Sequence, residues 1–446
     1  MPNVVELDLR RNFLAQLTYD CADTSCVPAL ACLDLSDNVF TEPPTALLEF
    51  RASLRWLSLK YNLLTEVTRN TFVDLRITEL DLSQNRISAL ESDAFSLLPE
   101  LTSINLESNN LTQLPNPAFD SAEKLAVVDL SDNFLGDLAP GAFASLFSLR
   151  VLDLSNNDLG AIHTQFVPGS LETLNLHDNR ISAIAADAFG AGRRLRYITL
   201  DGNFLHQLPD NVFGHCRSLS ALYLQGNQLT SITSDTLRGA HHTLTEVYLN
   251  DNNLLRIDDL GLPELRYLDL SFNSLTHFFL NTSRYLIALD LSDNPLEAVP
   301  DLSALVQLQL FGQRNHTIPT FDLSKFFSLR DLTGIDADAA PGSPSRVVVT
   351  SEPVSAWNLS AIEHLHVANM ELPTSVLSHL INTASVNSLH IGWRGLGVTQ
   401  LTNEDICSML SAEAVELAVW SSSYTSLKVC KNVPLRKVFL EHNSEL

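Results

Sequence analysis

A short pattern of leucines and asparagines recurs along the first 313 residues of the chain. Its unit is Leu-x-Leu-x-x-Asn, in which Ile or Val replaces the first Leu in some copies. Side chains alternate between the two faces of a β-strand, so the two leucines face inward and the x residues face outward. Each copy therefore predicts one short strand, and strands that recur at about 24 residues predict a stack of coils with a parallel sheet. The copies end at Asn12, Asn38, Asn62, Asn85, Asn109, Asn133, Asn157, Asn179, Asn203, Asn227, Asn252, Asn273 and Asn294.

The asparagine and a phenylalanine explain how each coil is closed and filled. A buried Asn amide has both donors and an acceptor, so it can satisfy backbone groups of adjacent coils and form a ladder. A phenylalanine follows most of these asparagines after nine or ten residues, where its ring would fill the wide side of the coil. These residues are Phe72, Phe95, Phe119, Phe143, Phe166, Phe189 and Phe213.

The extended pattern Leu-x-x-Leu-x-Leu-x-x-Asn-x-Leu, followed by Ala-Phe, resembles the leucine-rich repeat proteins. Within them it is similar to the 24-residue class of Toll-like receptors, Slit-type guidance proteins and small extracellular proteoglycans. The resemblance covers residues 1 to about 313. It implies an α/β solenoid, a right-handed horseshoe with a parallel β-sheet on its concave face, and a protein-binding role. It does not identify the ligand.

The pattern divides the chain into three parts. Residues 1–313 are expected to form the regular solenoid. Residues 314–346 include a stretch rich in Gly, Pro and Ser and are expected to form an irregular loop or excursion. Residues 347–446 are expected to continue the solenoid as degenerate repeats, with strands near 365–367, 389–391, 417–419 and 438–440. An independent second domain is the alternative for this last part.

Neither end of the chain has the features of a complete receptor. The first seven residues lack the basic and apolar regions of a signal peptide, and both ends lack a polar cap. We expect a fragment of a longer receptor-like protein; the alternative is that the end repeats cap poorly.

Charge and motif content exclude several classes of function. Asp and Glu outnumber Lys and Arg by 52 to 28, which gives a net charge of −24 and disfavours nucleic acid or an anionic membrane as partner. No apolar run is long enough for a membrane span. Phosphate-loop, His-Glu-x-x-His and dinucleotide motifs do not occur either. We therefore expect no catalytic, cofactor-binding or metal-binding residue, and the sequence predicts no oligomeric state.

Cysteines and glycosylation sequons favour an extracellular or cell-surface location. Cys21 and Cys26 lie in one enlarged loop that a local disulfide would staple, and free loop thiols are the alternative. Cys407 and Cys430 precede neighbouring strands by similar lengths, which would bring them near disulfide range. Cys32 and Cys216 have no evident partner and are expected to be core thiols. The sequons begin at Asn110, Asn281, Asn315 and Asn358. A cytoplasmic location is the alternative.

The outward strand positions predict where a ligand binds. Most of them are acidic or small, but aromatic residues interrupt them, and such residues are favoured anchors in binding patches. The predicted ligand-binding residues on the concave face are Trp56, Tyr61, Tyr197, Tyr223, Tyr248, Tyr267, Phe272, Asp201, Asp251 and Asp269. The acids favour a protein or glycoconjugate ligand with a basic face. The alternative is that the tyrosines only cover the sheet.

These features together predict a non-catalytic recognition module. The leading hypothesis is the ligand-binding ectodomain of a leucine-rich repeat receptor or adhesion protein in cell-surface signalling. The alternatives are an intracellular leucine-rich repeat scaffold and the sensor region of a receptor kinase whose catalytic domain lies outside this chain.

Overall fold

The computed structural model describes residues 4–18 and 29–296, apart from 93, 117, 118, 120 and 121, and shorter stretches after residue 300. These stretches are 300–302, 304–305, 308, 310–312, 320–322, 331–336, 345–348, 364–368, 370–371, 388–392, 407–408, 410, 416–420 and 437–441. The chain divides into two compact units, and each is described by itself. Unit 1 contains Met1–Gln228 and Asp235–Thr243, and unit 2 contains Leu229–Ser234 and Leu244–Leu446.

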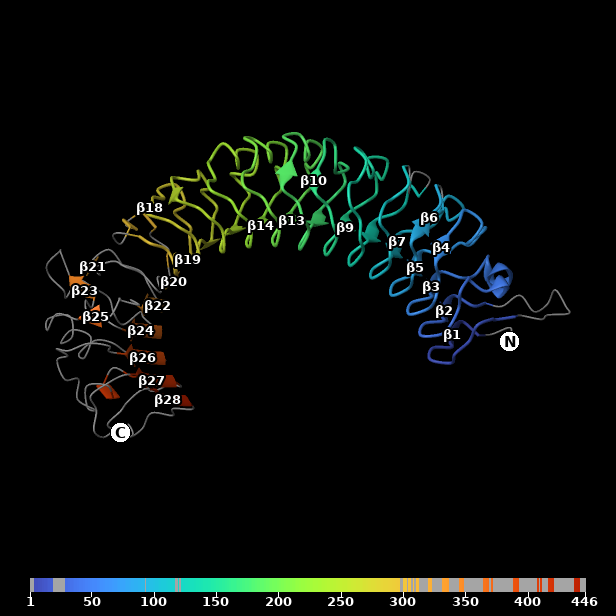
Figure 1. The fold of residues 1–446 in the computed structure, drawn as a ribbon, viewed down its shortest axis with the longest axis horizontal. Coiled ribbons are helices and arrows are strands. Elements are labelled where there is room, and N and C mark those ends of the chain that lie inside the picture. The colour runs from blue at the N-terminus through green and yellow to red at the C-terminus, as the bar shows by residue number, and fades with distance from the viewer. Residues whose placement is uncertain are drawn as a thin grey trace. The chain divides into compact units, whose positions relative to one another are not determined.

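Unit 1 is a stack of coils that each add one strand to a parallel sheet (Figure 1). Consecutive strands pair in register, so that the buried central residue of one, such as Leu33, lies beside that of the next, Leu57. The strands are β1 (Glu6–Asp8), β2 (Cys32–Asp34), β3 (Trp56–Ser58), β5 (Glu79–Asp81), β7 (Ser103–Asn105), β8 (Val127–Asp129), β9 (Val151–Asp153), β11 (Thr173–Asn175), β13 (Tyr197–Thr199) and β14 (Ala221–Tyr223). This arrangement confirms the predicted solenoid fold.

Short elements lie on the other side of the coils of unit 1, away from the main sheet (Figure 1). Two parallel pairs form there, β4 (Glu66–Val67) with β6 (Ala89–Leu90) and β10 (Ala161–Ile162) with β12 (Ala183–Ile184). The 3₁₀ helix η2 (Thr45–Phe50) replaces such a strand in one coil. We call the exposed face of the main sheet the inner face and the opposite side of the coils the outer side.

Unit 2 is built in the same way. Its main strands are β15 (Glu246–Tyr248), β17 (Tyr267–Asp269), β19 (Ala288–Asp290), β20 (Leu310–Gly312), β22 (Asp331–Asp336), β24 (His364–Ala368), β26 (Ser388–Gly392), β27 (Glu416–Trp420) and β28 (Lys437–Glu441), and neighbours pair in parallel. Smaller parallel pairings join β16 (Arg256–Ile257) to β18 (His277–Phe278), and β21 (Thr320–Asp322) to β23 (Ser345–Val348) and β25 (Met370–Glu371).

The four strand cores expected after residue 347 lie in β24, β26, β27 and β28. The stretch 314–346, expected as an irregular excursion, carries the short strands β21 and β22 and the first two residues of β23. The domain boundaries at 313 and 346 stay a prediction.

The asparagine ladder forms as expected, and we name each coil after its asparagine. In the Asn133 coil, the Asn133 side-chain amide donates to the carbonyl of Leu106 in the preceding coil at 3.0 Å and to those of Leu130 and Ser131 in its own coil at 3.1 Å each. Its Oδ1 accepts the backbone N–H of Leu111, in the preceding coil, at 3.0 Å. One buried side chain therefore satisfies backbone groups of two coils.

Phenylalanine rings fill the core on the outer side, also as expected. Phe95 stacks on Phe119 with centroids 5.5 Å apart, and Phe189 stacks on Phe213 at 5.6 Å. Phe166, which follows its asparagine after nine residues instead of ten, meets the Phe143 ring edge-on at 6.1 Å. Both arrangements are favourable for aromatic pairs. The packing of these phenylalanine rings thus accommodates coils of different length.

Replacing Asn133 by Leu should lower the free energy of unfolding by about 1–3 kcal/mol, because backbone groups of two coils lose their buried partner. Thermal and urea unfolding of the purified chain measure this loss. The matched control is Asn70→Leu, at an exposed position. Equal stability of the two variants would contradict the role assigned to the ladder.

Candidate functional site

The inner face consists of three rows of outward residues in each unit. The first and third residues of a strand form two rows, and they flank a central residue that is buried, as in β8, β9 and β11. The third row is the residue before each ladder asparagine, which has a positive φ in every coil from Asn12 to Asn294. Its left-handed backbone turns the N–H toward the next coil; the Tyr61 N–H, for example, donates to the Ser83 carbonyl at 3.0 Å. The rows are therefore set by the backbone of the repeat.

Most strand aspartates are tied to a serine two residues later. Asp81 Oδ1 accepts the Ser83 N–H at 3.0 Å and the Ser83 hydroxyl at 2.7 Å. Local bonds of this kind hold an aspartate in a turn. The same arrangement joins Asp34 to Ser36, Asp129 to Ser131, Asp153 to Ser155 and Asp269 to Ser271. Much of the acidic character of the inner face is thus fixed in position before any ligand arrives.

The three predicted acidic contacts differ in environment. Asp269, in unit 2, is half-buried, and burial raises its pKa, an effect that its bonds to Ser271 oppose and that the neighbouring Asp290 reinforces. Asp251, also in unit 2, is exposed in the left-handed row. Asp201, in unit 1, is only 13% exposed. Of the three, Asp251 is the carboxylate most open to a ligand.

Asp201 belongs to a small side-chain network. His177 Nδ1 lies 2.6 Å from Asp201 Oδ2, and His177 Nε2 lies 3.2 Å from a carboxylate oxygen of Asp178. A Cβ at Gly202 would come within 1.9 Å of Asp178 Oδ1, so a larger residue there would have to displace the Asp178 side chain. Asp201 is therefore held by a histidine of the preceding coil, a partner that the sequence analysis did not identify.

The predicted aromatic residues all lie on the inner face, but in different rows. Tyr197 and Tyr267 begin β13 and β17 and are 45% and 39% exposed. Tyr223 and Tyr248 end β14 and β15 and are half-buried, and the Tyr248 hydroxyl lies 3.5 Å from Glu246 Oε2. Tyr197 and Tyr223 belong to unit 1, and Tyr248 and Tyr267 to unit 2. Their role in binding stays a prediction.

The remaining predicted aromatics occupy the first and the left-handed rows. Trp56 begins β3 and is half-buried. Tyr61 and Phe272 lie in the left-handed row and are 53% and 58% exposed. The Lys60 ammonium lies 5.4 Å from the centre of the Tyr61 ring, within the range of a cation–π contact.

The secretory features are described only in part. Asn110 and Asn281 are exposed, and Cys407 is disulfide-bonded. Asn315, Asn358, Cys21, Cys26 and Cys430 lie outside the described residues.

The two free cysteines differ. Cys216 is a core thiol, as expected. Cys32 is half-buried at the start of β2, so the expectation of a core thiol is wrong there: it occupies an outward strand position, one residue before the buried Leu33.

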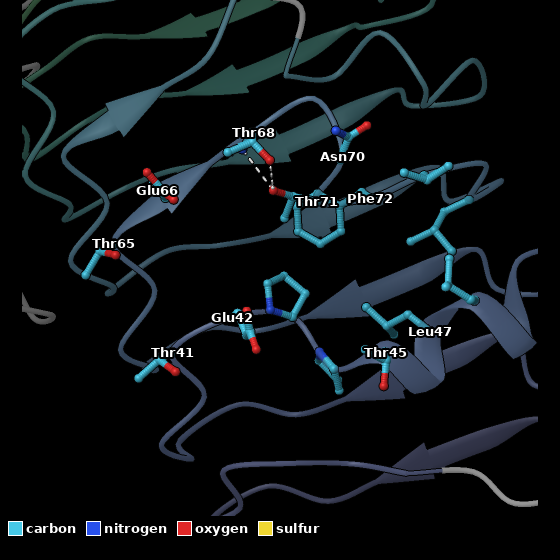
Figure 2. A pocket seen from close by; sticks show the side chains of 15 residues that line it. Thr41, Glu42, Thr45, Leu47, Thr65, Glu66, Thr68, Asn70, Thr71 and Phe72 are labelled. Atoms are coloured by element: carbon cyan, nitrogen blue, oxygen red, sulfur yellow. Dashed lines mark hydrogen bonds between the residues drawn. The ribbon is translucent and has the colours of Figure 1, made fainter.

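One feature of unit 1 was missed by the sequence analysis. A hollow of about 350 Å³ lies on the outer side, between the Asn38 and Asn62 coils (Figure 2). Its walls come from the residues around Pro43 and η2 in one coil and from β4 and the following turn in the next. The signal in the sequence was the pair Pro43–Pro44, which stands where the next coil has the residues of β4 and its flank.

Metal-ligand clusters and membrane-spanning helices are both absent from the described part of the chain. No three His, Cys, Asp or Glu side chains there are grouped to hold a metal ion. None of its helices has the length and apolar character needed to cross a membrane.

Comparison with known proteins decides the family. The model of the family described as "Leucine rich repeat" matches this chain at residues 28–87, 52–111, 75–133, 99–159 and 169–229. Fibromodulin from Oryctolagus cuniculus is 31% identical over 134 residues, which cover 24% of this chain and 90% of that sequence. The chain belongs to the leucine-rich repeat proteins.

Other leucine-rich repeat proteins show the same relation. Lumican from Gallus gallus is 30% identical over 161 residues, covering 30% of this chain and 47% of lumican, so the chain spans about half the length of that curated relative. The solved ectodomain of the plant membrane receptor kinase GASSHO1/SCHENGEN3 from Arabidopsis thaliana has a TM-score of 0.61 at 22% identity, covering 98% of this chain and 53% of that one. A leucine-rich repeat protein of Leptospira interrogans has a TM-score of 0.57 at 21% identity, covering 84% and 93%. These two structures show the shared fold.

The two free thiols of this leucine-rich repeat protein should react at very different rates. Burial raises the pKa of Cys216 to about 12, so the reactive thiolate is scarce near neutral pH, and its side chain is 0% exposed. Iodoacetamide should therefore modify Cys32 first in the native protein, as followed by mass spectrometry of tryptic peptides. In urea both should react alike. Equal rates in the native protein would contradict the placement of Cys216 in the core.

Proposed function

We propose that this chain is a non-catalytic recognition module, the ligand-binding part of a receptor or adhesion protein of the 24-residue leucine-rich repeat class. The observation that carries the proposal is the exposure of Tyr197 and Tyr267 on strands whose central residues, Ile198 and Leu268, are buried. Large aromatic side chains left in water on a rigid sheet are typical of contact surfaces. The relatives lumican and fibromodulin are non-catalytic, which supports the absence of chemistry.

The ligand class follows from charge. The chain carries a net charge of −24, and its strand aspartates are held in place by their serines. A fixed carboxylate loses little freedom when a cation approaches, which favours electrostatic steering of a positive partner. We therefore propose a protein or glycoconjugate with a basic face as the ligand.

An extracellular or cell-surface location fits three observations. Cys407 is disulfide-bonded, and disulfides persist mainly in oxidising compartments. The sequon residues Asn110 and Asn281 are exposed. Lumican and fibromodulin are extracellular. An intracellular scaffold, the alternative, would keep its cysteines reduced.

Protein isolated from its natural source should carry glycan on at least one of Asn110, Asn281, Asn315 and Asn358, and the pairs Cys21–Cys26 and Cys407–Cys430 should be oxidised. Peptide mapping without reductant, before and after removal of glycans, measures both. Bare sequons together with four free thiols would favour the intracellular scaffold.

The inner face is tested with a partner selected from a panel of purified extracellular domains. Tyr197→Ala and Tyr267→Ala, made separately, should each weaken binding by about 1–2 kcal/mol, because a buried aromatic anchor is lost. Surface plasmon resonance measures affinity and association rate. The matched control is Tyr285→Ala, 48% exposed but in a turn outside the sheet.

Salt tests the electrostatic part of the same proposal. The association rate should fall as ionic strength rises, because exposed charges are screened beyond about 8 Å at 0.15 M salt. Equal losses for the two inner-face variants and the control would contradict the assigned face. A salt-insensitive rate would contradict the basic ligand.

A further inference from the structure

The hollow on the outer side of unit 1 supports a second binding site, distinct from the inner face. We propose that it binds an extended peptide segment of a protein partner, in which basic residues flank an apolar one, and that this segment pairs with the open edge of β4. The proposal rests on the backbone of β4, on the apolar floor of the hollow and on the charge of its rim.

The first observation is an unpaired strand edge. One side of β4 is occupied, because the Ser88 N–H donates to the Thr65 carbonyl and the Glu91 N–H to the Val67 carbonyl, both at 2.9 Å. Alternate residues of a parallel strand bond to opposite neighbours, so the N–H and C=O of Glu66, between those two carbonyls, point away from β6 and toward the hollow.

The neighbouring coil cannot close that edge. Pro43 and Pro44 stand opposite β4 and have no N–H to donate. On this side the two coils are joined by a backbone hydrogen bond from the Leu63 N–H to the Phe40 carbonyl, at 2.9 Å. Among the described residues, the next backbone bond between them goes from the Arg76 N–H to the Arg51 carbonyl. The interruption spans the hollow, so a strand from outside can take the place that the prolines leave open.

The second observation is the apolar floor. Leu47, Phe72 and Leu75 form the buried floor of the hollow. Leu48, which also lines it, is 46% exposed and offers an apolar contact to a side chain that enters. The volume of about 350 Å³ lies at the lower end of the range for ligand pockets. It suits one apolar side chain together with its backbone.

The third observation is the charge at the rim. Glu42 and Glu66 are exposed and line the hollow, with the hydroxyls of Thr41 and Thr65 near them (Figure 2). Neither glutamate takes part in an ion pair within the described part of the chain. Lysine or arginine side chains on both sides of the apolar residue complement these carboxylates.

The same charge argues against a segment of this chain as the occupant. Residues 19–28, which precede these two coils in the sequence, contain Asp20 and Asp23 and no Lys or Arg. Two added carboxylates beside Glu42 and Glu66 would repel them. A basic segment of another protein is the occupant that the rim favours.

The probe is the peptide acetyl-Thr-Lys-Leu-Lys-Thr-amide. In an extended chain its leucine lies on one face and its two lysines on the other, so that the leucine can enter the hollow on the buried side of β4 while the lysines lie on the exposed side, where Glu66 is. Calorimetry should give saturable binding with a Kd on the order of 0.1–1 mM, as for a short peptide. Peptides with glycine for leucine or glutamate for both lysines should bind at least about fivefold more weakly.

Amide exchange tests the strand pairing directly. With the probe bound, NMR should show slower hydrogen exchange at the Glu66 amide, because its N–H then has a partner. A probe that is N-methylated on the leucine amide should lose most of its affinity. Unchanged exchange at Glu66 in the presence of saturating probe would overturn the pairing.

Matched variants test the rim. Glu42→Gln with Glu66→Gln should weaken the lysine probe about fivefold, whereas Glu49→Gln with Glu123→Gln, two exposed glutamates outside the hollow, should not. Equal weakening in both double variants, or no binding at millimolar probe, would overturn the site. Tyr197→Ala should leave probe binding unchanged, so the outcome here is independent of the inner-face proposal.

Discussion

The buried asparagine ladder is the interaction on which the rest of the structure depends. Each coil must turn sharply after its strand, and the turn leaves backbone N–H and C=O groups inside the protein, where water cannot reach them. One amide supplies both the donors and the acceptor that these groups need. In the first coil, the bonds that the Asn12 amide donates to described residues go to carbonyls of its own coil, those of Leu9 and Arg10. Each later asparagine of the ladder accepts a backbone N–H from the coil before it, as Asn133 does from Leu111. These bonds between coils therefore all point in the same direction along the chain.

The inner face inherits its properties from this repeat. Because the ladder fixes the strand and the turn, the outward residues stand at regular positions, and an aspartate and a serine two residues apart bond to each other in coil after coil. The carboxylates are consequently less adaptable than freely rotating surface acids. Where the repeat departs from Asp and Ser, as at His177 and Asp201, contacts between neighbouring coils take over. Specific chemistry on this face is therefore concentrated where the repeat is least regular.

Much of the fold was predictable because it rests on spacing. The Leu-x-Leu strands, the ladder and the stacked phenylalanines follow from side-chain alternation and a coil of nearly constant length. Contacts between coils were harder to foresee. The pairing of His177 with Asp201 joins residues 24 positions apart whose types match no motif. Cys32 was expected in the core because a lone cysteine usually is buried, although its position before Leu33 marks it as an outward strand residue. The hollow was missed because it arises where Pro43 and Pro44 have no N–H to donate to the next coil. A hydrogen bond that is not formed leaves no periodic pattern in the sequence.

The left-handed row has a consequence for how such an array can diversify. A non-glycine residue in this conformation costs about 1–2 kcal/mol relative to glycine. Gly202 and Gly226 avoid that cost, whereas Tyr61 and Phe272 bear it and place a large ring at the surface. A change from glycine to an aromatic residue in this row exchanges folding stability for contact area at a single site, while the strand and the ladder stay as they are. Substitutions in this row can thus change the surface one coil at a time. The stability that the ladder supplies limits the number of coils that can carry such a residue together.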